Sequence, residues 1–149
     1  MKAKSLKLIA NSREDLRVIS AHLQDAIVSI NDIANLKKNR IFLIQLNRFM
    51  WEDIEKGVFR QNKRIRTILK FENVTKVISK NIKQKNNKRF LDFLAIECNL
   101  LADKSYEIDL IFSGDAIIKI VSEVIEVTLD DQGAPWKSKT KPKHEFYNA

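Results

Sequence analysis

Cysteine, glycine, proline and long apolar runs are all scarce in this sequence, and each absence excludes a class of protein. Its 149 residues include one cysteine, three glycines and two prolines. The lone Cys98 excludes a disulfide framework and favours a cytoplasmic protein. Three scattered glycines cannot build a P-loop or a Rossmann fingerprint. No run of about eighteen apolar residues and no signal peptide is present, so we expect neither a membrane span nor export.

Residues suited to metal or covalent chemistry are also few. Cys98 and the two histidines, His22 and His144, lie far apart in the sequence and show no metal-ligand spacing. A lone cysteine in an alternating apolar segment is more often a small buried hydrophobe than a nucleophile. We therefore predict neither a metal nor a cofactor, and an enzyme of unknown reaction is only a lesser alternative.

A chain of this length fits one domain with its own hydrophobic core. We place a single α+β domain at residues 1–131 and a basic C-terminal tail at residues 132–149, where glycine, proline and lysine become frequent. Trp136 within the tail is expected to dock on the domain, because a free tail gains nothing from a tryptophan.

One helix is predicted near the start of the chain, at about residues 13–25. Ser12 is a suitable N-cap, and acidic residues follow it in the first turn. Apolar residues recur at helical spacing at Leu16, Ile19, Leu23 and Ile27. A short strand is expected before this helix, at residues 6–10.

The most apolar stretch, residues 40–52, is predicted to form a central strand. At period two, one face carries Phe42, Ile44, Leu46 and Met50, and the other carries Ile41, Leu43, Phe49 and Trp51. Because both faces are apolar, we expect this strand to be buried on both.

The remaining patterns predict a mostly antiparallel sheet. Residues 26–34 are expected to form a hairpin with the central strand, and further strands are expected at residues 65–78, 90–98, 106–112 and 116–129. Residues 68–77 resemble residues 117–127, which suggests two three-stranded meanders. The expected fold is a sandwich or small barrel, with the N-terminal helix covering an open end or face.

Polar residues in and near the central strand form a candidate interaction site, because polar groups are not buried without partners. The residues are His22, Asn47, Arg48, Trp51 and Glu52. The alternative is structural. In that interpretation, Asn47 and Arg48 pair with Glu52 or with backbone carbonyls and tie the central strand to its neighbours.

Charge is unevenly distributed along the chain. The formal net charge is +8, and residues 37–89 hold sixteen Lys and Arg against four Asp and Glu, whereas residues 92–131 hold two against ten. This asymmetry hints at an electrostatic face, although an AT-biased genome also enriches lysine. The second half is therefore expected to be acidic beside a basic first half, an arrangement that suits head-to-tail self-association or a partner of mixed charge.

The basic region at residues 60–89 gives an alternative function, the binding of RNA or single-stranded DNA. The candidate contacts are Arg60, Lys63, Arg64, Arg66, Lys80, Lys83, Lys85, Lys88 and Arg89. The aromatic residues expected on an exposed sheet face are absent, and a solvated basic loop face explains the same lysines.

Several segments resemble one uncharacterised bacterial family. They are residues 6–10, 19–26, 46–49 with Trp51 and Glu52, and 131–133 with Trp136 and residues 142–144. The family is the alphaproteobacterial domain-of-unknown-function family number 2948, and the resemblance covers nearly the whole chain. It implies a small single-domain cytoplasmic protein with no assigned activity. We predict a non-enzymatic binding or accessory protein that has an unknown protein partner or self-associates.

Overall fold

The structure is a computed structural model that describes residues 5–52, 63–82 and 90–137. In chain order its elements are β1 (Lys7–Ala10), α1 (Arg13–Leu23), β2 (Ile27–Ser29), the 3-10 turn η1 (Ile30–Asp32), β3 (Ile33–Leu36), the 3-10 turn η2 (Lys37–Asn39), β4 (Ile41–Phe49), β5 (Lys63–Phe71), β6 (Val74–Lys80), β7 (Phe90–Leu100), β8 (Tyr106–Phe112), β9 (Ile117–Ser122) and β10 (Val127–Lys137). Neighbouring strands pair antiparallel. The prediction of an α+β fold with a mostly antiparallel sheet is confirmed.

Helix α1 forms where the sequence predicted it, because its start is capped and one of its faces is apolar. The Ser12 hydroxyl accepts a hydrogen bond from the backbone N–H of Asp15 at 3.1 Å. Leu16, Ile19 and Leu23 form its buried face. The helix ends at Leu23 and not at residue 25, because Asp25 has a φ of 64°, which a right-handed helix does not accommodate.

The cap gives a first prediction. Replacing Ser12 with alanine removes the acceptor for the Asp15 N–H, and we expect the free energy of unfolding to fall by about 1 kcal/mol. Urea unfolding followed by circular dichroism measures the change. Ser79→Ala, at an exposed serine in β6, is the control and is expected to change stability by less than about 0.5 kcal/mol. A Ser12→Ala loss no larger than that of the control contradicts the cap.

Two three-stranded meanders build the sheet. The order of its strands is β1, β10, β5, β4, β2, β7, β8, β9 and β6, with β3 also paired to β4. β3, β4 and β5 form the first meander, and β7, β8 and β9 form the second. The strand that follows each meander pairs with the last strand of the other meander. β6 follows the first meander and pairs with β9, and β10 follows the second and pairs with β5. The prediction of two meanders is confirmed, but the first begins at β3 and not at residue 26: residues 27–29 of the predicted strand form β2, which pairs with β7 at three positions and with β4 at one.

The meanders meet at a corner of the sheet. β5 and β6 form one bent segment interrupted by Glu72 and Asn73, and β9 and β10 form its bent partner. At the bend, the Glu72 N–H donates to the Glu126 carbonyl at 3.0 Å, and the Glu123 N–H donates to the Asn73 carbonyl at 3.2 Å. Such bends let strands pass from one layer to another. The similarity of residues 68–77 to residues 117–127 therefore has a physical origin, because both segments turn this corner.

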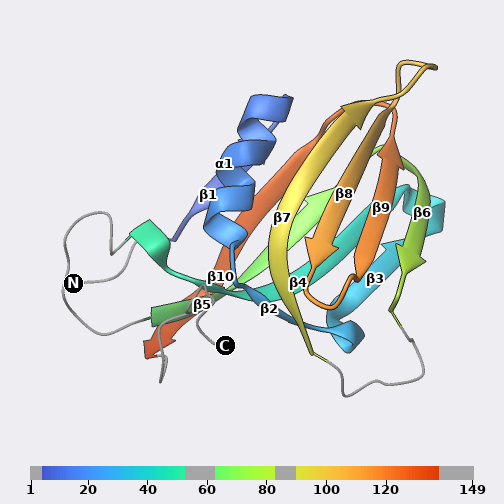
Figure 1. The fold of residues 1–149 in the computed structure, drawn as a ribbon. Coiled ribbons are helices and arrows are strands. Elements are labelled where there is room, and N and C mark those ends of the chain that lie inside the picture. The colour runs from blue at the N-terminus through green and yellow to red at the C-terminus, as the bar shows by residue number, and fades with distance from the viewer. Residues whose placement is uncertain (1–4, 53–62, 83–89, 138–149) are drawn as a thin grey trace.

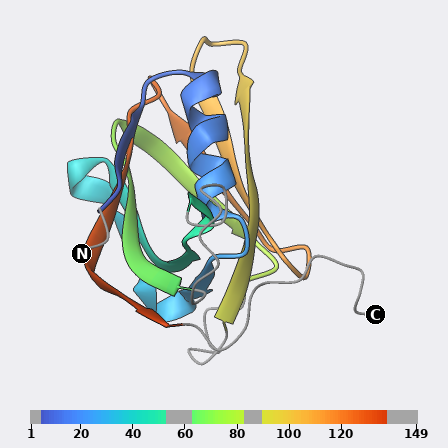
Figure 2. The ribbon, with the colours of Figure 1, turned by 90° about the vertical axis from the view of Figure 1, so that its left-hand side faces the viewer.

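The sheet curls around the core but does not close, so the predicted small barrel is wrong. Helix α1 lies between β1 and β7 at one end of the curled sheet (Figures 1 and 2). The core between the two meanders and the helix includes Ile19, Ile44, Leu69, Phe93, Leu110 and Ile120. The helix thus covers an open end of the sheet, as expected from the sequence.

The central strand β4 is buried on one face along its length but on the other face only at its end, where Phe49 packs against Trp51 and Arg64, which corrects the sequence prediction. Phe42, Ile44 and Leu46 are buried, whereas Ile41 and Leu43 on the opposite face are half-buried. From Ile41 to Asn47 this second face is only half-buried, as is common in antiparallel sheets, which often leave one face to solvent. Arg48 takes the next position on the buried face.

Part of the predicted tail belongs to the sheet. β10 extends to Lys137, and it pairs with β5 at Trp136 opposite Arg64 and at Lys137 opposite Lys63. The backbone of Trp136 is therefore held by β5, while its side chain is 40% exposed. Residues 138–149 lie outside the described residues.

Candidate functional site

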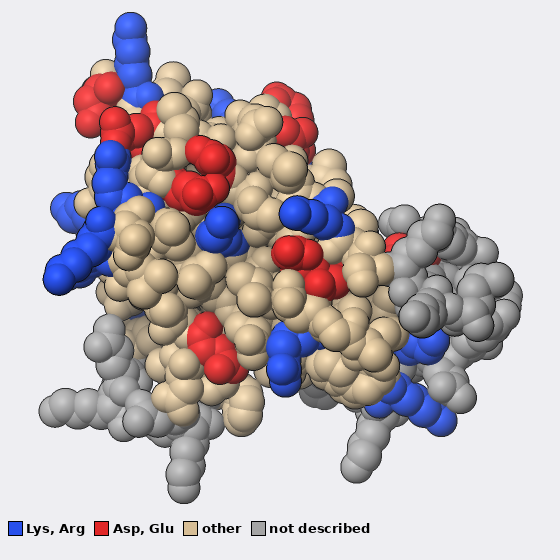
Figure 3. All heavy atoms as spheres, turned by 180° about the vertical axis from the view of Figure 1, so that it is seen from behind, with Lys and Arg blue, Asp and Glu red and all other residues tan. Residues whose placement is uncertain are grey.

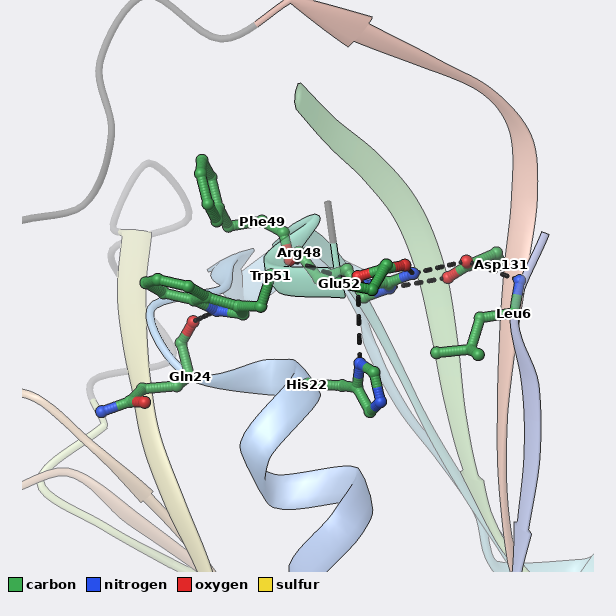
Figure 4. Close-up of polar contacts among 8 residues, drawn as sticks. All are labelled: Leu6, His22, Gln24, Arg48, Phe49, Trp51, Glu52 and Asp131. Carbon is green, nitrogen blue, oxygen red and sulfur yellow. Dashed lines mark hydrogen bonds and ion pairs between the residues drawn. The ribbon is translucent and has the colours of Figure 1, made fainter. Parts of the chain in front are cut away.

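Arg48 is the centre of the polar group predicted from the sequence. Its side chain is fully buried, and its Nε and Nη2 donate to the Asp131 carboxylate at 2.9 and 2.7 Å. Its Nη1 and Nη2 donate to the Glu52 carboxylate at 2.9 and 2.7 Å (Figure 4). Nη1 also donates to the Phe49 carbonyl at 3.4 Å. A guanidinium has five N–H donors, and each of them is engaged here, so none is left for a ligand.

Asp131 is the partner that the sequence did not reveal. It lies on β10, 83 positions after Arg48, and nothing in a linear pattern joins the two. Its Oδ2 also accepts the Leu6 N–H at 2.8 Å, and its own N–H donates to the Leu6 carbonyl at 2.9 Å. One carboxylate therefore connects β10 both to β4 and to the residue that precedes β1.

Arg48 and Glu52 stabilise each other's charged forms. Burial lowers the pKa of Arg48, but hydrogen bonds to Asp131 and Glu52 outweigh it, so the pKa lies above its usual value. Burial raises the pKa of Glu52, and the hydrogen bonds and charge of Arg48 outweigh that effect and bring the pKa below its usual value. Both groups are therefore held in their charged forms.

The lowered pKa of Glu52 predicts a pH dependence of stability. A carboxylate with a lower pKa in the folded state contributes stability above its unfolded pKa, and that contribution is lost as the pH falls through the folded pKa. We expect the wild type to lose stability below about pH 4, and Glu52→Gln to lose less over the same range. Unfolding free energies measured from neutral to acidic pH test this, with Glu97→Gln, at an exposed glutamate, as control. If the unfolding free energy falls equally with pH in the wild type and in Glu52→Gln, the proposed stabilisation of the Glu52 carboxylate by Arg48 is contradicted.

The other predicted site residues divide between two places. The His22 Nδ1 lies 3.9 Å from Glu52 Oε1, and the Trp51 Nε1 donates to the Gln24 carbonyl at 2.9 Å beside the same cluster (Figure 4). Asn47 precedes Arg48 on β4 and is therefore on the other face of the strand. The structure brings four of the five residues together and leaves Asn47 apart. With every Arg48 donor occupied, the cluster is suited to tying β4, β10 and the helix end together.

The predicted nucleic-acid contacts do not gather into one patch among the described residues. Lys63 begins β5 and Lys80 ends β6, so the two lie at opposite ends of the bent segment. Arg64 donates to the carbonyls of Asp25 and Asn47 at 3.2 and 3.1 Å, and burial lowers its pKa. Arg66 and Lys80 are exposed. Arg60, Lys83, Lys85, Lys88 and Arg89 lie outside the described residues.

Folding interleaves the basic and acidic halves of the chain. Because β10 pairs with β5 and β6 pairs with β9, acidic segments lie beside basic ones. Arg40 forms an ion pair with Glu123, and Arg48 forms one with Asp131. Basic and acidic side chains are mixed over the face that Figure 3 shows. The charge asymmetry in the sequence is therefore not a charge asymmetry of this face.

A groove lies where the curled sheet stays open, between β3 and β6. It consists of two adjoining hollows of about 600 and 270 Å³ that share Asn35, Lys37 and Val77 in their linings. We call it the seam groove. Near the smaller hollow, the two sides touch through a hydrogen bond from the Val74 N–H to the Arg40 carbonyl at 2.9 Å. Strand order alone creates this groove, so no local sequence signal predicted it.

The two hollows of the seam groove differ in character. Six of the ten residues that line the larger are apolar, namely Ile30, Ile33, Phe42, Val77, Ile82 and Ile118, and the other four, Asn31, Asn35, Lys37 and Ser79, add polar surface. The smaller is lined by Lys37, Arg40 and Lys76 together with small and polar residues. Among the described residues that line the two hollows there is no Asp, Glu, His or Cys. The groove thus combines aliphatic and polar side chains over the larger part and carries most of its cations over the smaller part.

Comparisons with known proteins give a family and no function. Residues 6–144 match the model of a family described as "Protein of unknown function (DUF2948)". No curated protein and no solved structure matches the chain. In the part of the chain that the structure describes, no His, Cys, Asp and Glu side chains are grouped so as to hold a metal ion. The described ranges also contain no helix with the length and apolar character needed to cross a membrane.

Proposed function

The chain belongs to the DUF2948 family of proteins of unknown function, and we propose that it is a non-catalytic binding module that receives an extended polypeptide segment in the seam groove. The observation that carries this proposal is the pair of open strand edges on either side of an apolar floor. Among the described strands, β3 pairs only with β4 and β6 pairs only with β9. An extended segment laid between them would pair with one edge or both.

Strand addition follows from the backbone chemistry of an edge. Alternate residues of an edge strand direct their N–H and C=O groups away from the paired neighbour. A bound segment gains main-chain hydrogen bonds from these groups, and its alternate side chains enter pockets below. Here Val77 and Ser79 of β6 and Ile33 of β3 line the larger hollow, so the side chains that face the groove come from alternate positions of the edges.

The floor supplies the apolar part of recognition. The volume of the larger hollow, about 600 Å³, is in the range of ordinary ligand sites, roughly 300–1,000 Å³. Its apolar lining favours aliphatic side chains. The described lining residues carry no carboxylate, imidazole or thiol, the groups that most often act as acid, base or nucleophile, which favours binding over catalysis.

Another hollow, of about 630 Å³, lies over the outer face of β1, β10 and β5. It supports the proposal less, because it lies over strands whose backbones already pair with one another. Its lining mixes the cations Lys7 and Lys70 with the carboxylates Glu72, Glu126 and Asp130. Unlike the seam groove, this hollow does not lie between two unpaired strand edges, and its charges are of both signs.

A defined peptide tests the proposal. The probe is a fluorescent peptide of about eight residues in which valine alternates with threonine, matched to the length of a strand, titrated with the full chain by fluorescence anisotropy. Ser79→Trp fills the groove, and we expect it to weaken binding at least about tenfold. Ile78→Trp places the same side chain on the opposite face of β6 and is expected to bind as the wild type does.

Two outcomes contradict the proposal. One is the absence of saturable binding to the wild type. The other is binding that Ser79→Trp and Ile78→Trp leave equally strong, which places the peptide elsewhere. A peptide with N-methylated alternate residues adds a check on the mode, because it keeps the side chains but loses strand pairing, and it is expected to bind weakly.

A further inference from the structure

We infer that the seam groove selects an acidic segment, with carboxylates at the end beside Arg40 and aliphatic side chains along the rest. This inference rests on the proposed function and adds the chemistry of the partner. Its basis is the uneven lining of the groove. The three cations Lys37, Arg40 and Lys76 all line the smaller hollow, and only Lys37 also lines the larger one.

The cations reach the groove from both of its sides. Lys37 belongs to η2, Arg40 follows η2, and Lys76 belongs to β6. Lys37, Lys76 and Arg40 are exposed. Arg40 is paired with Glu123, whereas no described carboxylate lies within ion-pair distance of Lys37 or Lys76 in the described ranges. Lys37 and Lys76 therefore lie on opposite sides of the smaller hollow, and neither has an ion-pair partner among the described residues.

The same lysines disfavour other occupants of the groove. Lysine on an edge strand opposes pairing with another basic strand, and the chain itself carries a formal net charge of +8. A second copy of this chain is therefore a poor occupant. An acidic segment meets attraction in the smaller hollow and an aliphatic floor in the larger one, so charge and shape select the same partner.

A polypeptide fits the groove better than a nucleic acid does. Single-strand binders stack bases on aromatic side chains along a basic track. The apolar part of this groove is aliphatic apart from Phe42, which is itself buried with 1% of its surface exposed. Of the three cations only Lys37 also lines the larger hollow, so positive charge does not run along the whole groove, whereas a nucleic acid carries a charge at every nucleotide.

Three peptides that differ only in their end residues test the inference. Each joins a run of glutamate, glutamine or lysine to the same valine–threonine alternation, and each is made with the run at either end because the direction of the segment is open. We expect the glutamate peptide to bind the full chain about tenfold more tightly than the glutamine peptide at low salt, and by a smaller factor near physiological salt. The lysine peptide is expected to bind most weakly.

Two pairs of neighbouring lysines supply matched variants. Lys37→Glu with Lys76→Glu reverses the charge of the smaller hollow, and we expect it to abolish or reverse the preference for glutamate. Lys38→Glu with Lys80→Glu makes the same change in net charge at exposed lysines that do not line the groove. This control double variant is expected to keep the preference.

The outcomes separate the preference for an acidic segment from strand addition itself. Equal binding of the three peptides, or equal loss of preference in both double variants, overturns the inference and leaves the strand-addition proposal standing. Absence of binding by all three peptides overturns both. A single-stranded oligonucleotide that displaces the glutamate peptide, and does so less well from the Lys37→Glu, Lys76→Glu variant, would assign the groove to nucleic acid and overturn the inference.

Discussion

Replacing Arg48 with alanine is expected to lower the free energy of unfolding by about 3–5 kcal/mol. The variant leaves two carboxylates, Asp131 and Glu52, beside each other without the cation that both contact. Asp131 is itself 6% exposed, so its charge is removed from water without compensation. Urea unfolding at neutral pH, followed by circular dichroism and tryptophan fluorescence, measures the loss.

Arg66→Ala is the matched control for this prediction. Arg66 is an exposed arginine on β5, and its loss is expected to change stability by less than about 0.5 kcal/mol. A double-mutant cycle between Arg48→Ala and Glu52→Gln should give a coupling of about 0.5–3 kcal/mol, the range for residues in contact. An Arg48→Ala loss as small as that of Arg66→Ala contradicts the role of Arg48 as the tie between β4 and β10.

Replacing Phe93 with alanine is the second large effect, with an expected loss of about 3–5 kcal/mol. Phe93 is fully buried on β7, and its ring meets Phe112 edge to face at 5.5 Å between centroids. The substitution leaves a cavity inside the second meander and removes the aromatic pair. Thermal and urea unfolding measure the loss.

Phe90 offers a control on the same strand. It lies three positions before Phe93, and its side chain is 67% exposed. Phe90→Ala is expected to change stability by less than about 0.5 kcal/mol. Similar losses from the two substitutions would show that the inner and outer faces of β7 are not assigned correctly.

The sequence predicted the local parts of the fold because their signals are local. The Ser12 cap and the apolar stripe of α1 lie within one segment of the chain. β8 spans Tyr106–Phe112, as its strict alternation predicted. Strands joined by short turns pair with their neighbours, which is why the two meanders could also be predicted.

Pairings between strands far apart in the sequence could not be predicted, and they determine both the seam groove and the surroundings of Arg48. The pairing of β10 with β5 and of β6 with β9 leaves the seam groove open, and it also brings Asp131 to Arg48. The sequence offered Glu52 as a possible partner of Arg48 because both lie in the same short stretch, but Asp131 is 83 positions away. Two apolar faces on β4 predicted burial on both sides, because composition does not distinguish a half-buried face from a buried one.

The charge pattern misled for the same reason. A run of basic residues in sequence becomes a basic surface only when folding keeps its members on one face. Here Lys63 and Lys80 lie at opposite ends of the bent segment formed by β5 and β6. Arg64 donates hydrogen bonds to the carbonyls of Asp25 and Asn47. The cations that line the seam groove come instead from η2, the residue after it and β6.

Amide hydrogen exchange of the full chain, with and without the glutamate-headed peptide, tests the central claim most directly. That claim is that an extended segment enters between β3 and β6. We predict that the amides of β3 and β6 become protected on binding, while β1, the other edge strand in the order of the sheet, exchanges as before. Protection at β1, or binding without added protection at β3 and β6, would contradict the claim.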